Sequence, residues 1–333
     1  MRIVAPTLDD LCRKVYRVLL KGAQPTSPSR NPAHERTGVL LELRNPRARL
    51  SRTETRGKVF SCIGELLWYL SRDNRLEFIA YYLREYEKES EDGETVYGGY
   101  GRRLFAHSSH NQVRTLIETL RHRDRADTRR GVLQIFEAAD TEGNHTRNRR
   151  KEIPCTLALQ FLLRSGRLGL YVTMRSQDAY KGLPHDIFCF TMLQEIIARS
   201  VGAELGEYKQ FVGSLHLYDK ERPLAEQYVA EDVQQTIPMP PMPLGDPWHA
   251  IAILLDAEAQ IRGGSPPGRA TTSLSPYWMD LVRLLQIFAG GDEARHRRLK
   301  SAMAFKGFNV YIDGRSSAKP RPPQPPRQPL LPF

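Results

Sequence analysis

Apolar residues recur three and four positions apart near the start of the chain, from Leu8 to Leu19. This spacing predicts an amphipathic helix over residues 8–21, with Thr7 as a suitable N-cap and Gly22 at its end. Four later segments repeat the spacing and predict further helices, over residues 60–70, 113–120, 187–201 and 278–288.

The centre of the chain changes to short runs of β-branched and apolar residues, which predict strands. The predicted strands cover residues 39–43, 132–136, 156–163, 168–174 and 210–218. Residues 164–167 would join two of them as a hairpin. Segments 25–32 and 182–184 have the composition of a loop and of a turn. Helices mixed with antiparallel strands in this order predict an α+β fold.

The C-terminal part of the chain has a different composition. Prolines cluster over residues 236–247 and predict a linker. We expect a main domain over residues 1–235, the linker and a helical C-terminal extension over residues 236–314, and a basic proline-rich tail over residues 315–333. The composition of the tail is typical of disordered or extended chains.

The overall composition is that of an ordinary globular protein. The 333 residues are 40% hydrophobic and 26% charged, which excludes a collagen-like, disordered or disulfide-stapled chain. No apolar run approaches the roughly 20 residues that cross a bilayer. Asp9 and Asp10 fall where a signal peptide is apolar. We therefore expect a cytoplasmic protein without a membrane partner.

Charge and cysteine content narrow the candidate chemistry only in part. The 49 basic and 38 acidic residues give a net charge of +11. This charge suits phosphorylated small ligands, nucleic acid or simply a solvated basic surface. The four cysteines show no CxxC spacing, so we expect neither disulfides nor a zinc site, and no metal cofactor.

Cys155 is the candidate nucleophile of the chain. It follows Pro154 at the start of a predicted strand, and Arg175 ends the other strand of the same hairpin. A guanidinium close to a thiol favours the thiolate, which is the nucleophilic form. These two residues alone do not separate a nucleophile from an ordinary buried cysteine.

Several motifs around Cys155 resemble those of the thymidylate synthases, in the same order and spacing. They are Gly64-Glu65-Leu66-Leu67-Trp68-Tyr69-Leu70, Val96-Tyr97-Gly98, Thr128-Arg129-Arg130, Ile153-Pro154-Cys155, Arg175-Ser176-Gln177-Asp178, Gly182-Leu183-Pro184 and His216-Leu217-Tyr218. The resemblance covers roughly residues 8–230. It implies a thymidylate synthase-like fold, in which helices flank a mixed sheet, and a catalytic domain within residues 1–235.

The resemblance also implies an enzyme that transfers a one-carbon group to a pyrimidine nucleoside monophosphate, with 5,10-methylenetetrahydrofolate as co-substrate. Cys155 would add to C6 of the base, so that C5 becomes an enamine-like carbon that attacks the methylene group of the folate. Glu65 would organise the proton transfers, and Tyr97 would support the site near the base.

The substrate-binding residues follow from the same resemblance. The implied ligands are Arg175, Ser176 and Arg30 for the 5′-phosphate, Arg129 and Arg130 for the same phosphate from the second subunit of a homodimer, His216 and Tyr218 for the sugar 3′-hydroxyl, and Asp178, Gly182 and Leu83 for the folate. Guanidinium groups suit phosphate because they can donate two parallel hydrogen bonds. Taken singly, several of these residues have ordinary alternatives, such as a solvated basic pair or a strand histidine.

Asp186 departs from the family pattern, which has an asparagine at the residue that reads the edge of the base. An amide suits uracil, which offers an acceptor at O4 and a donor at N3. A carboxylate instead accepts from the 4-amino group of cytosine. The same exchange sets the family's cytidylate hydroxymethylases apart, so the resemblance implies a cytosine nucleotide. An aspartate here would also stabilise the dipole of the helix that begins beside it.

A second departure concerns the folate. The segment between Leu70 and Tyr97 has no tryptophan, and Leu83 and Tyr86 lie near the positions where thymidylate synthases keep indoles beside the folate. In a hydroxymethylase, water adds to the C5 methylene, and loss of an indole would admit that water. The chain most resembles the CMP hydroxymethylases of nucleoside-antibiotic pathways of the mildiomycin type, which also have an added C-terminal region.

The expected function is therefore folate-dependent hydroxymethylation of CMP, in preference to dCMP, with release of tetrahydrofolate. Two alternatives stay open. One is methylation of dUMP, as in a true thymidylate synthase. The other is a basic nucleic-acid-binding protein on a non-catalytic synthase scaffold, although we do not expect a nucleic-acid partner.

Overall fold

The computed structural model describes residues 1–27, 31–51, 59–107, 109–122, 127–142, 150–231 and 237–313, together with Pro322 and Gln324. Within these residues the chain forms one sheet of seven strands and eleven α-helices. It divides into two compact units that alternate along the sequence. Unit 1 comprises residues 1–57, 112–149 and 153–239, and unit 2 comprises residues 58–111, 150–152 and 240–333.

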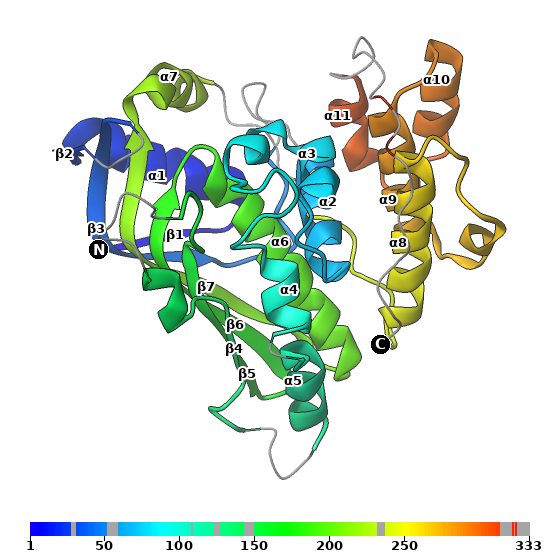
Figure 1. Cartoon of the computed structure of the whole chain (residues 1–333), viewed down its shortest axis with the longest axis horizontal. Helices are drawn as coiled ribbons and strands as arrows, with labels where there is room; N and C mark the ends of the chain where they lie inside the picture. The colour runs from blue at the N-terminus through cyan, green and yellow to red at the C-terminus, as the bar shows by residue number, and fades with distance from the viewer. Residues whose placement is uncertain are drawn as a thin grey trace. The chain divides into compact units, whose positions relative to one another are not determined.

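Unit 1 holds the whole sheet (Figure 1). The strands are β1 (Arg2–Ala5), β2 (Gln24–Thr26), β3 (Ala33–Leu43), β4 (Val132–Gln134), β5 (Thr156–Arg164), β6 (Arg167–Asp178) and β7 (Glu204–Tyr218). Their order is β1-β3-β7-β6-β5-β4, and β2 pairs with β3. Because β1 is parallel to β3 and β6 to β7, whereas the other pairs are antiparallel, the sheet is mixed. This confirms the predicted α+β class.

Two helices of unit 1 pack against each other and against the strands. The helices of this unit are α1 (Leu8–Gly22), α5 (Gln112–Arg121), α6 (Gly182–Ser200) and α7 (Arg222–Ala230). α1 contacts β1, β3 and β7, and α6 contacts β6 and β7 (Figure 1). Leu11, Val15 and Leu19 are fully buried on the apolar face of α1, so the helical spacing in the sequence marks the side that meets the core.

The N-terminal helix is confirmed, whereas the predicted turn before α6 is wrong. α1 begins at Leu8, and the side chain of its N-cap Thr7 accepts a hydrogen bond from the backbone N–H of Asp10 at 3.1 Å. Residues 182–184 are the first turn of α6. Pro184 is tolerated there because the first backbone N–H groups of a helix have no intrahelical partner.

The predicted loop over residues 25–32 is wrong at its start. Gln24–Thr26 forms β2, which pairs with β3 only, at the edge of the sheet. Pro25 is compatible with an edge strand because its nitrogen has no hydrogen to donate to a second neighbour. Residues 28–30, including the predicted phosphate ligand Arg30, lie outside the described residues.

Unit 2 is helical. Its α-helices are α2 (Val59–Leu70), α3 (Leu76–Tyr82), α4 (Tyr100–Phe105), α8 (Trp248–Arg262), α9 (Pro276–Ala289), α10 (Glu293–Ser301) and α11 (Asn309–Asp313). Every residue of α2 is buried, and α2 contacts α3, α4 and α9. Gly64 permits the close contact with α3, since a Cβ there would lie 2.1 Å from Cγ of Tyr82. The Tyr82 ring also stacks on Phe288 at 4.9 Å.

The C-terminal region is helical, as predicted. α9 covers the helix predicted over residues 278–288, and the neighbouring α8 was not predicted. Apart from Pro322 and Gln324, the tail over residues 315–333 lies outside the described residues. The domain limits at residues 235 and 314 stay predictions. Within the described ranges, none of the helices is both long and apolar enough to cross a membrane.

Candidate active site

Arg175 holds the segment that carries the candidate nucleophile. Cys155 is half-buried and directly precedes β5. Arg175, on the neighbouring strand β6, donates from Nε to the carbonyl of Pro154 at 2.9 Å and from Nη2 to the carbonyl of Ile153 at 2.8 Å. Its backbone N–H donates to the carbonyl of Cys155 at 2.9 Å. The guanidinium therefore lies beside the residues that precede the thiol, as the predicted hairpin requires.

Asp178 and His216 are opposite each other in the parallel pair β6 and β7. Asp178 Oδ1 accepts from the backbone N–H groups of Tyr180 at 2.8 Å and Lys181 at 3.0 Å, just before α6. Burial lowers the pKa of His216 below its usual 6.5, against the opposing effect of Asp178. A neutral imidazole has one donor and one acceptor nitrogen. The edge of the Tyr218 ring meets it at 4.9 Å, and Ser176 pairs with Ser214 on the same two strands.

Asp186 is the fifth residue of α6 and contacts β6 through a side-chain hydrogen bond. Its Oδ2 accepts from Nε2 of Gln177 at 2.8 Å. Gly182 makes room for this contact, because a Cβ at that position would lie 2.7 Å from Gln177 Nε2 and 3.5 Å from Asp186 Oδ2. The predicted folate-binding role of Gly182 stays a prediction, and the close approach of these side chains is a structural reason for the glycine.

Arg129 and Arg130 are exposed and precede β4, with Gly131 between Arg130 and the strand. Their backbone is held in place, because the carbonyl of Arg129 accepts from Gln160 Nε2 at 3.0 Å and the N–H of Arg130 donates to Thr128 Oγ1 at 3.1 Å. Both guanidinium groups are therefore presented at one end of the edge strand of the sheet.

Glu65 belongs to unit 2 and is buried on α2. Its Oε1 accepts hydrogen bonds from the hydroxyls of Tyr69 at 2.9 Å and Tyr86 at 3.1 Å. Burial raises the pKa of Glu65 to about 7, although the two phenols act in the opposite direction. A carboxyl group with this pKa can take or give a proton near neutral pH.

The raised pKa of Glu65 predicts a pH-dependent stability. Between the unfolded pKa of about 4.5 and the folded pKa of about 7, the unfolded chain has already released the proton that the folded chain keeps. The free energy of unfolding therefore falls as pH rises through this window, by about 3 kcal/mol in total. Glu65→Gln should remove this loss, because an amide oxygen still accepts from both tyrosines. Urea unfolding of both proteins at pH 5 and pH 8 measures the difference, and parallel pH profiles would contradict it.

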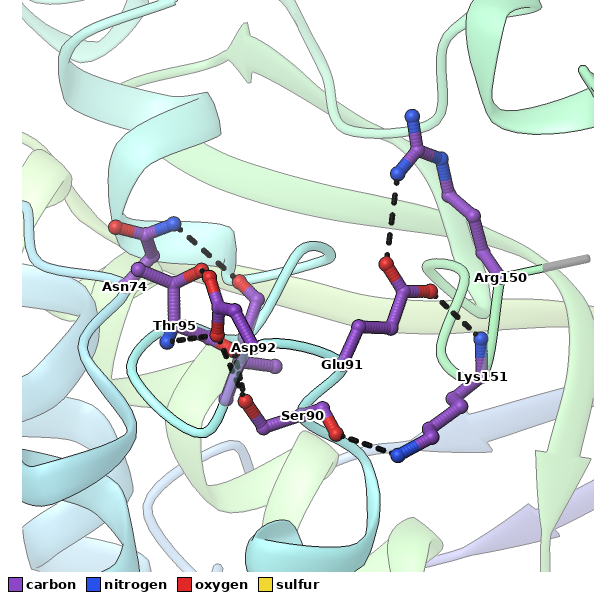
Figure 2. Close-up of polar contacts among 8 residues, drawn as sticks. Asn74, Ser90, Glu91, Asp92, Thr95, Arg150 and Lys151 are labelled. Carbon is purple, nitrogen blue, oxygen red and sulfur yellow. Dashed lines mark hydrogen bonds and ion pairs between the residues drawn. The ribbon is translucent and has the colours of Figure 1, made fainter. Parts of the chain in front are cut away.

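A tight turn precedes Tyr97 (Figure 2). The Asp92 carboxylate accepts from the backbone N–H and the hydroxyl of Thr95, both at 2.7 Å, and from Ser90 Oγ at 3.0 Å. These bonds, led by the backbone N–H of Thr95, hold the pKa of Asp92 well below its usual range. Asn74 Nδ2 donates to the carbonyl of Val96 at 3.4 Å, so the turn is tied to the segment after α2.

Residues 150 and 151 hold this turn from its other side. Lys151 donates from Nζ to the carbonyl of Ser90 at 2.8 Å and from its backbone N–H to Glu91 at 2.9 Å, and Arg150 forms an ion pair with Glu91 at 3.7 Å (Figure 2). The Arg150 guanidinium lies 3.7 Å from the centre of the Tyr97 ring, and that of Arg103 lies 5.1 Å from it. Tyr97 is therefore held by cation–π contacts.

Leu83 lies between α3 and the short 3₁₀ helix η2 (Arg84–Lys88). Its backbone N–H donates to the carbonyl of Ile79 at 2.7 Å, and its side chain is half-buried. Tyr86, on η2, meets the ring of Trp68 edge-on at 5.5 Å. The hydroxyl of Tyr86, which donates to Glu65, therefore belongs to the segment between Leu70 and Tyr97 that contains no tryptophan.

Four residues that hold site side chains were not among the predicted site residues, and these are Gln177, Tyr69, Tyr86 and Arg150. Tyr69 was open to prediction, because it follows Glu65 by four residues and the two share one helix face. No sequence pattern around Arg150 predicts its contact with Tyr97. For a metal, no group of three or more His, Cys, Asp or Glu side chains in the described ranges is placed to hold one.

Comparison with known proteins identifies the relatives of this chain. A family model described as thymidylate synthase matches residues 41–249, more than half of the chain. The deoxyuridylate hydroxymethyltransferase of Pseudomonas phage M6 is 34% identical over 168 residues, which are 49% of this chain and 46% of that protein. The protein of the same name from Bacillus phage SP01 is 30% identical over 217 residues, 61% of this chain and 55% of that protein.

A bacterial relative has a different name. The thymidylate synthase of Coxiella burnetii (strain Dugway 5J108-111) is 28% identical over 165 residues, which are 48% of this chain and 60% of that protein. The chain thus spans about half the length of the curated relatives it matches.

Proposed function

Because the chain belongs to the thymidylate synthase family, we propose that it transfers a one-carbon group from 5,10-methylenetetrahydrofolate to C5 of a pyrimidine nucleotide. The specific reaction we propose is 5-hydroxymethylation of CMP, favoured over dCMP. The observation that carries this proposal is the carboxyl group of Asp186 near the start of α6, in hydrogen-bond contact with Gln177.

The choice of base rests on the acceptor character of Asp186. A carboxylate accepts a hydrogen bond from the 4-amino group of cytosine, and a proton shared with N3 completes the pair. Uracil presents an acceptor at O4 instead, which would face a second acceptor. Two acceptors that face each other leave both without a donor, which disfavours binding, so Asp186 selects cytosine.

Hydroxymethylation in place of methylation is supported by two observations. The two phage relatives are named deoxyuridylate hydroxymethyltransferases. The segment over residues 71–96 has no tryptophan, and its Tyr86 directs a hydroxyl at Glu65. A polar hydroxyl and a carboxyl of near-neutral pKa are groups that can orient a water and accept its proton.

In the proposed reaction the sulfur of Cys155 bonds to C6 of cytosine, and C5 attacks the methylene carbon that the folate supplies. The attack requires one of the two carbon–nitrogen bonds of the methylene bridge to break, and tetrahydrofolate leaves when the second breaks and C5 loses its proton; the two folate nitrogens take up the protons that C5 and the added water release. Water then adds to the exocyclic methylene, Glu65 takes a proton from the water, and loss of the Cys155 sulfur from C6 restores the aromatic base. No oxidation or reduction occurs, so the folate product is tetrahydrofolate.

The binding groups that we propose fit their ligands. Arg175 uses two of its five N–H donors on the carbonyls of residues 153 and 154, and its guanidinium with Ser176 holds the 5′-phosphate. His216, kept neutral by burial, binds the 3′-hydroxyl together with Tyr218. The Asp178 carboxylate, held by two backbone N–H groups, is an acceptor suited to the N–H donors of a pterin.

A second candidate function is 5-hydroxymethylation of deoxyuridylate, since that is the substrate named for the phage relatives. It predicts a uridine product despite the carboxyl group at residue 186. The two functions differ in the base and in the sugar, and one competition among the four nucleotides separates them.

The test is a product analysis by mass spectrometry with CMP, dCMP, UMP and dUMP offered together with methylenetetrahydrofolate. We expect 5-hydroxymethyl-CMP and tetrahydrofolate. Formation of dihydrofolate would overturn hydroxymethylation, because that product requires hydride transfer from the folate to the methylene. A hydroxymethylated uridine nucleotide would favour the second candidate.

We also propose a homodimer that pairs two copies of the sheet through the face opposite α1 and α6. On this face, Val132 and Phe211 are 46% and 45% exposed, although both belong to sheet strands. The register places them on one side with Tyr171 and Thr173 between them. Arg129 and Arg130 lie at the edge of this face, so each subunit can donate them to the phosphate site of the other.

Phe211→Asp should therefore dissociate the dimer and lower turnover at the same time, since burying a charge in an apolar interface is strongly unfavourable. Light scattering after size exclusion measures the mass. Leu224→Asp is the matched control, because Leu224 is 42% exposed on α7 in the same unit, and it should leave the mass of a dimer. A dimeric Phe211→Asp variant would exclude this interface.

A further inference from the structure

Asp186 is the end of a chain of hydrogen bonds between buried side chains of unit 1. Tyr208 Oη donates to Gln210 Oε1 at 2.6 Å, and Gln210 Nε2 donates to Gln177 Oε1 at 2.6 Å. Gln177 Nε2 then donates to Asp186 Oδ2 at 2.8 Å. Three elements of unit 1, namely β7, β6 and α6, contribute these groups.

The chain of bonds is buried except at its last member. Tyr208 and Gln210 are fully buried, and Gln177 is 2% exposed, whereas Asp186 is half-buried. A buried amide whose oxygen or nitrogen loses its partner is penalised by the full desolvation of that group. The bonds therefore hold one another in place. A substitution at one end of the chain of bonds changes the orientation of the side chains at the other end.

The direction of these bonds is determined by groups that can only accept. A carboxylate has no proton to give, so Gln177 must turn Nε2 toward Asp186 and Oε1 toward Gln210. The thioether of Met174 also only accepts, and Gln210 Nε2 contacts its sulfur at 2.9 Å. This contact turns Gln210 Oε1 toward Tyr208. Burial raises the pKa of Tyr208 well above its usual value, so the phenol keeps the proton that it donates.

We propose that Gln177 is a positioning residue that sets the base preference together with residue 186. Because Gln177 always presents a donor, one oxygen of residue 186 is committed to it. With aspartate, the group left for the base is a second acceptor, which suits the amino group of cytosine. With asparagine, the oxygen turns to Gln177 and the amino group is left for the base, which suits O4 of uracil. This inference rests on the proposed role of Asp186 in reading the base.

The close packing at Gly182 supports this assignment. A Cβ there would displace Gln177 Nε2, which it would meet at 2.7 Å. The first residue of α6 is thus compatible with this side-chain contact only as glycine. The geometry that gives residue 186 its orientation involves both β6 and the start of α6.

The experiment measures dissociation constants of the full-length protein for CMP and UMP by calorimetry, without folate. Gln177→Met removes the donor at similar side-chain volume and should reduce the preference for CMP over UMP by about tenfold. In combination with Asp186→Asn it should also abolish the uracil preference that Asp186→Asn alone creates, because the introduced amide would no longer be oriented.

Gln194→Met is the matched control. Gln194 is also fully buried, lies on α6 with Asp186, and donates to the carbonyls of Leu168 and Glu207. Its loss should reduce stability similarly and leave the CMP to UMP ratio unchanged. If Gln177→Met does not fold, Tyr208→Phe tests the other end of the chain of bonds, with a shift of about twofold to threefold in the same direction expected.

Two results separate this inference from the proposed function. If Asp186→Asn reverses the preference while Gln177→Met and Tyr208→Phe leave the ratio unchanged, residue 186 reads the base alone and the positioning role is wrong. If Asp186→Asn also leaves the ratio unchanged, the base-reading role itself is wrong.

Discussion

Replacing Cys155 with alanine should lower turnover of CMP by at least about 10⁴-fold and leave the dissociation constant of CMP within about threefold of that of the wild type. In the proposed reaction the sulfur forms the bond to C6 that makes C5 nucleophilic, so its removal stops the first covalent step. Binding should survive because the proposed phosphate and sugar ligands are other side chains. Product formation by mass spectrometry and calorimetry with CMP measure the two quantities.

Cys12→Ala is the matched control for this variant. Cys12 is fully buried on α1, so its replacement should reduce stability modestly and leave turnover per folded enzyme unchanged. Turnover that survived Cys155→Ala would exclude covalent catalysis at this residue. A protein without turnover that bound RNA equally well with either residue at 155 would favour the non-catalytic, nucleic-acid-binding alternative.

The sequence predicts a helix correctly where only one face of that helix is apolar. α1 is of this kind, and its start at Leu8 agrees with the prediction. α8 was missed because its apolar residues are spread around the helix without a clear stripe. The turn predicted at residues 182–184 is wrong because proline and glycine also fit the first turn of a helix, which only tertiary packing decides.

The candidate site was predictable only for residues that local motifs contain. Cys155 and Arg175 are brought to one hairpin by strand pairing, which the sequence signals locally. The contact from Gln210 through Gln177 to Asp186 depends instead on the register of β6 against β7. A parallel pair has no short connection that fixes register, so no local pattern predicts these partners.

The base preference is the property that one substitution should change most. Asp186→Asn should shift the ratio of kcat/KM for CMP over UMP toward UMP by on the order of 100-fold. The physical reason is an exchange of an acceptor for a donor at the edge of the base, with the oxygen that Gln177 holds retained. Competition between the two nucleotides with methylenetetrahydrofolate measures this ratio directly.

The control must separate hydrogen bonding from charge, since Asp186→Asn also removes a negative charge. Asp256→Asn makes the same change of net charge on α8, at a side chain that accepts from Gln260 at 2.8 Å. It should leave the ratio unchanged. If Asp186→Asn lowers the free energy of unfolding by about 0.3–1 kcal/mol and leaves the ratio unchanged, Asp186 stabilises the start of α6 and does not select the base. Loss of stability and loss of selectivity are therefore measured on the same variant, and only a change in the ratio supports a cytosine nucleotide as substrate.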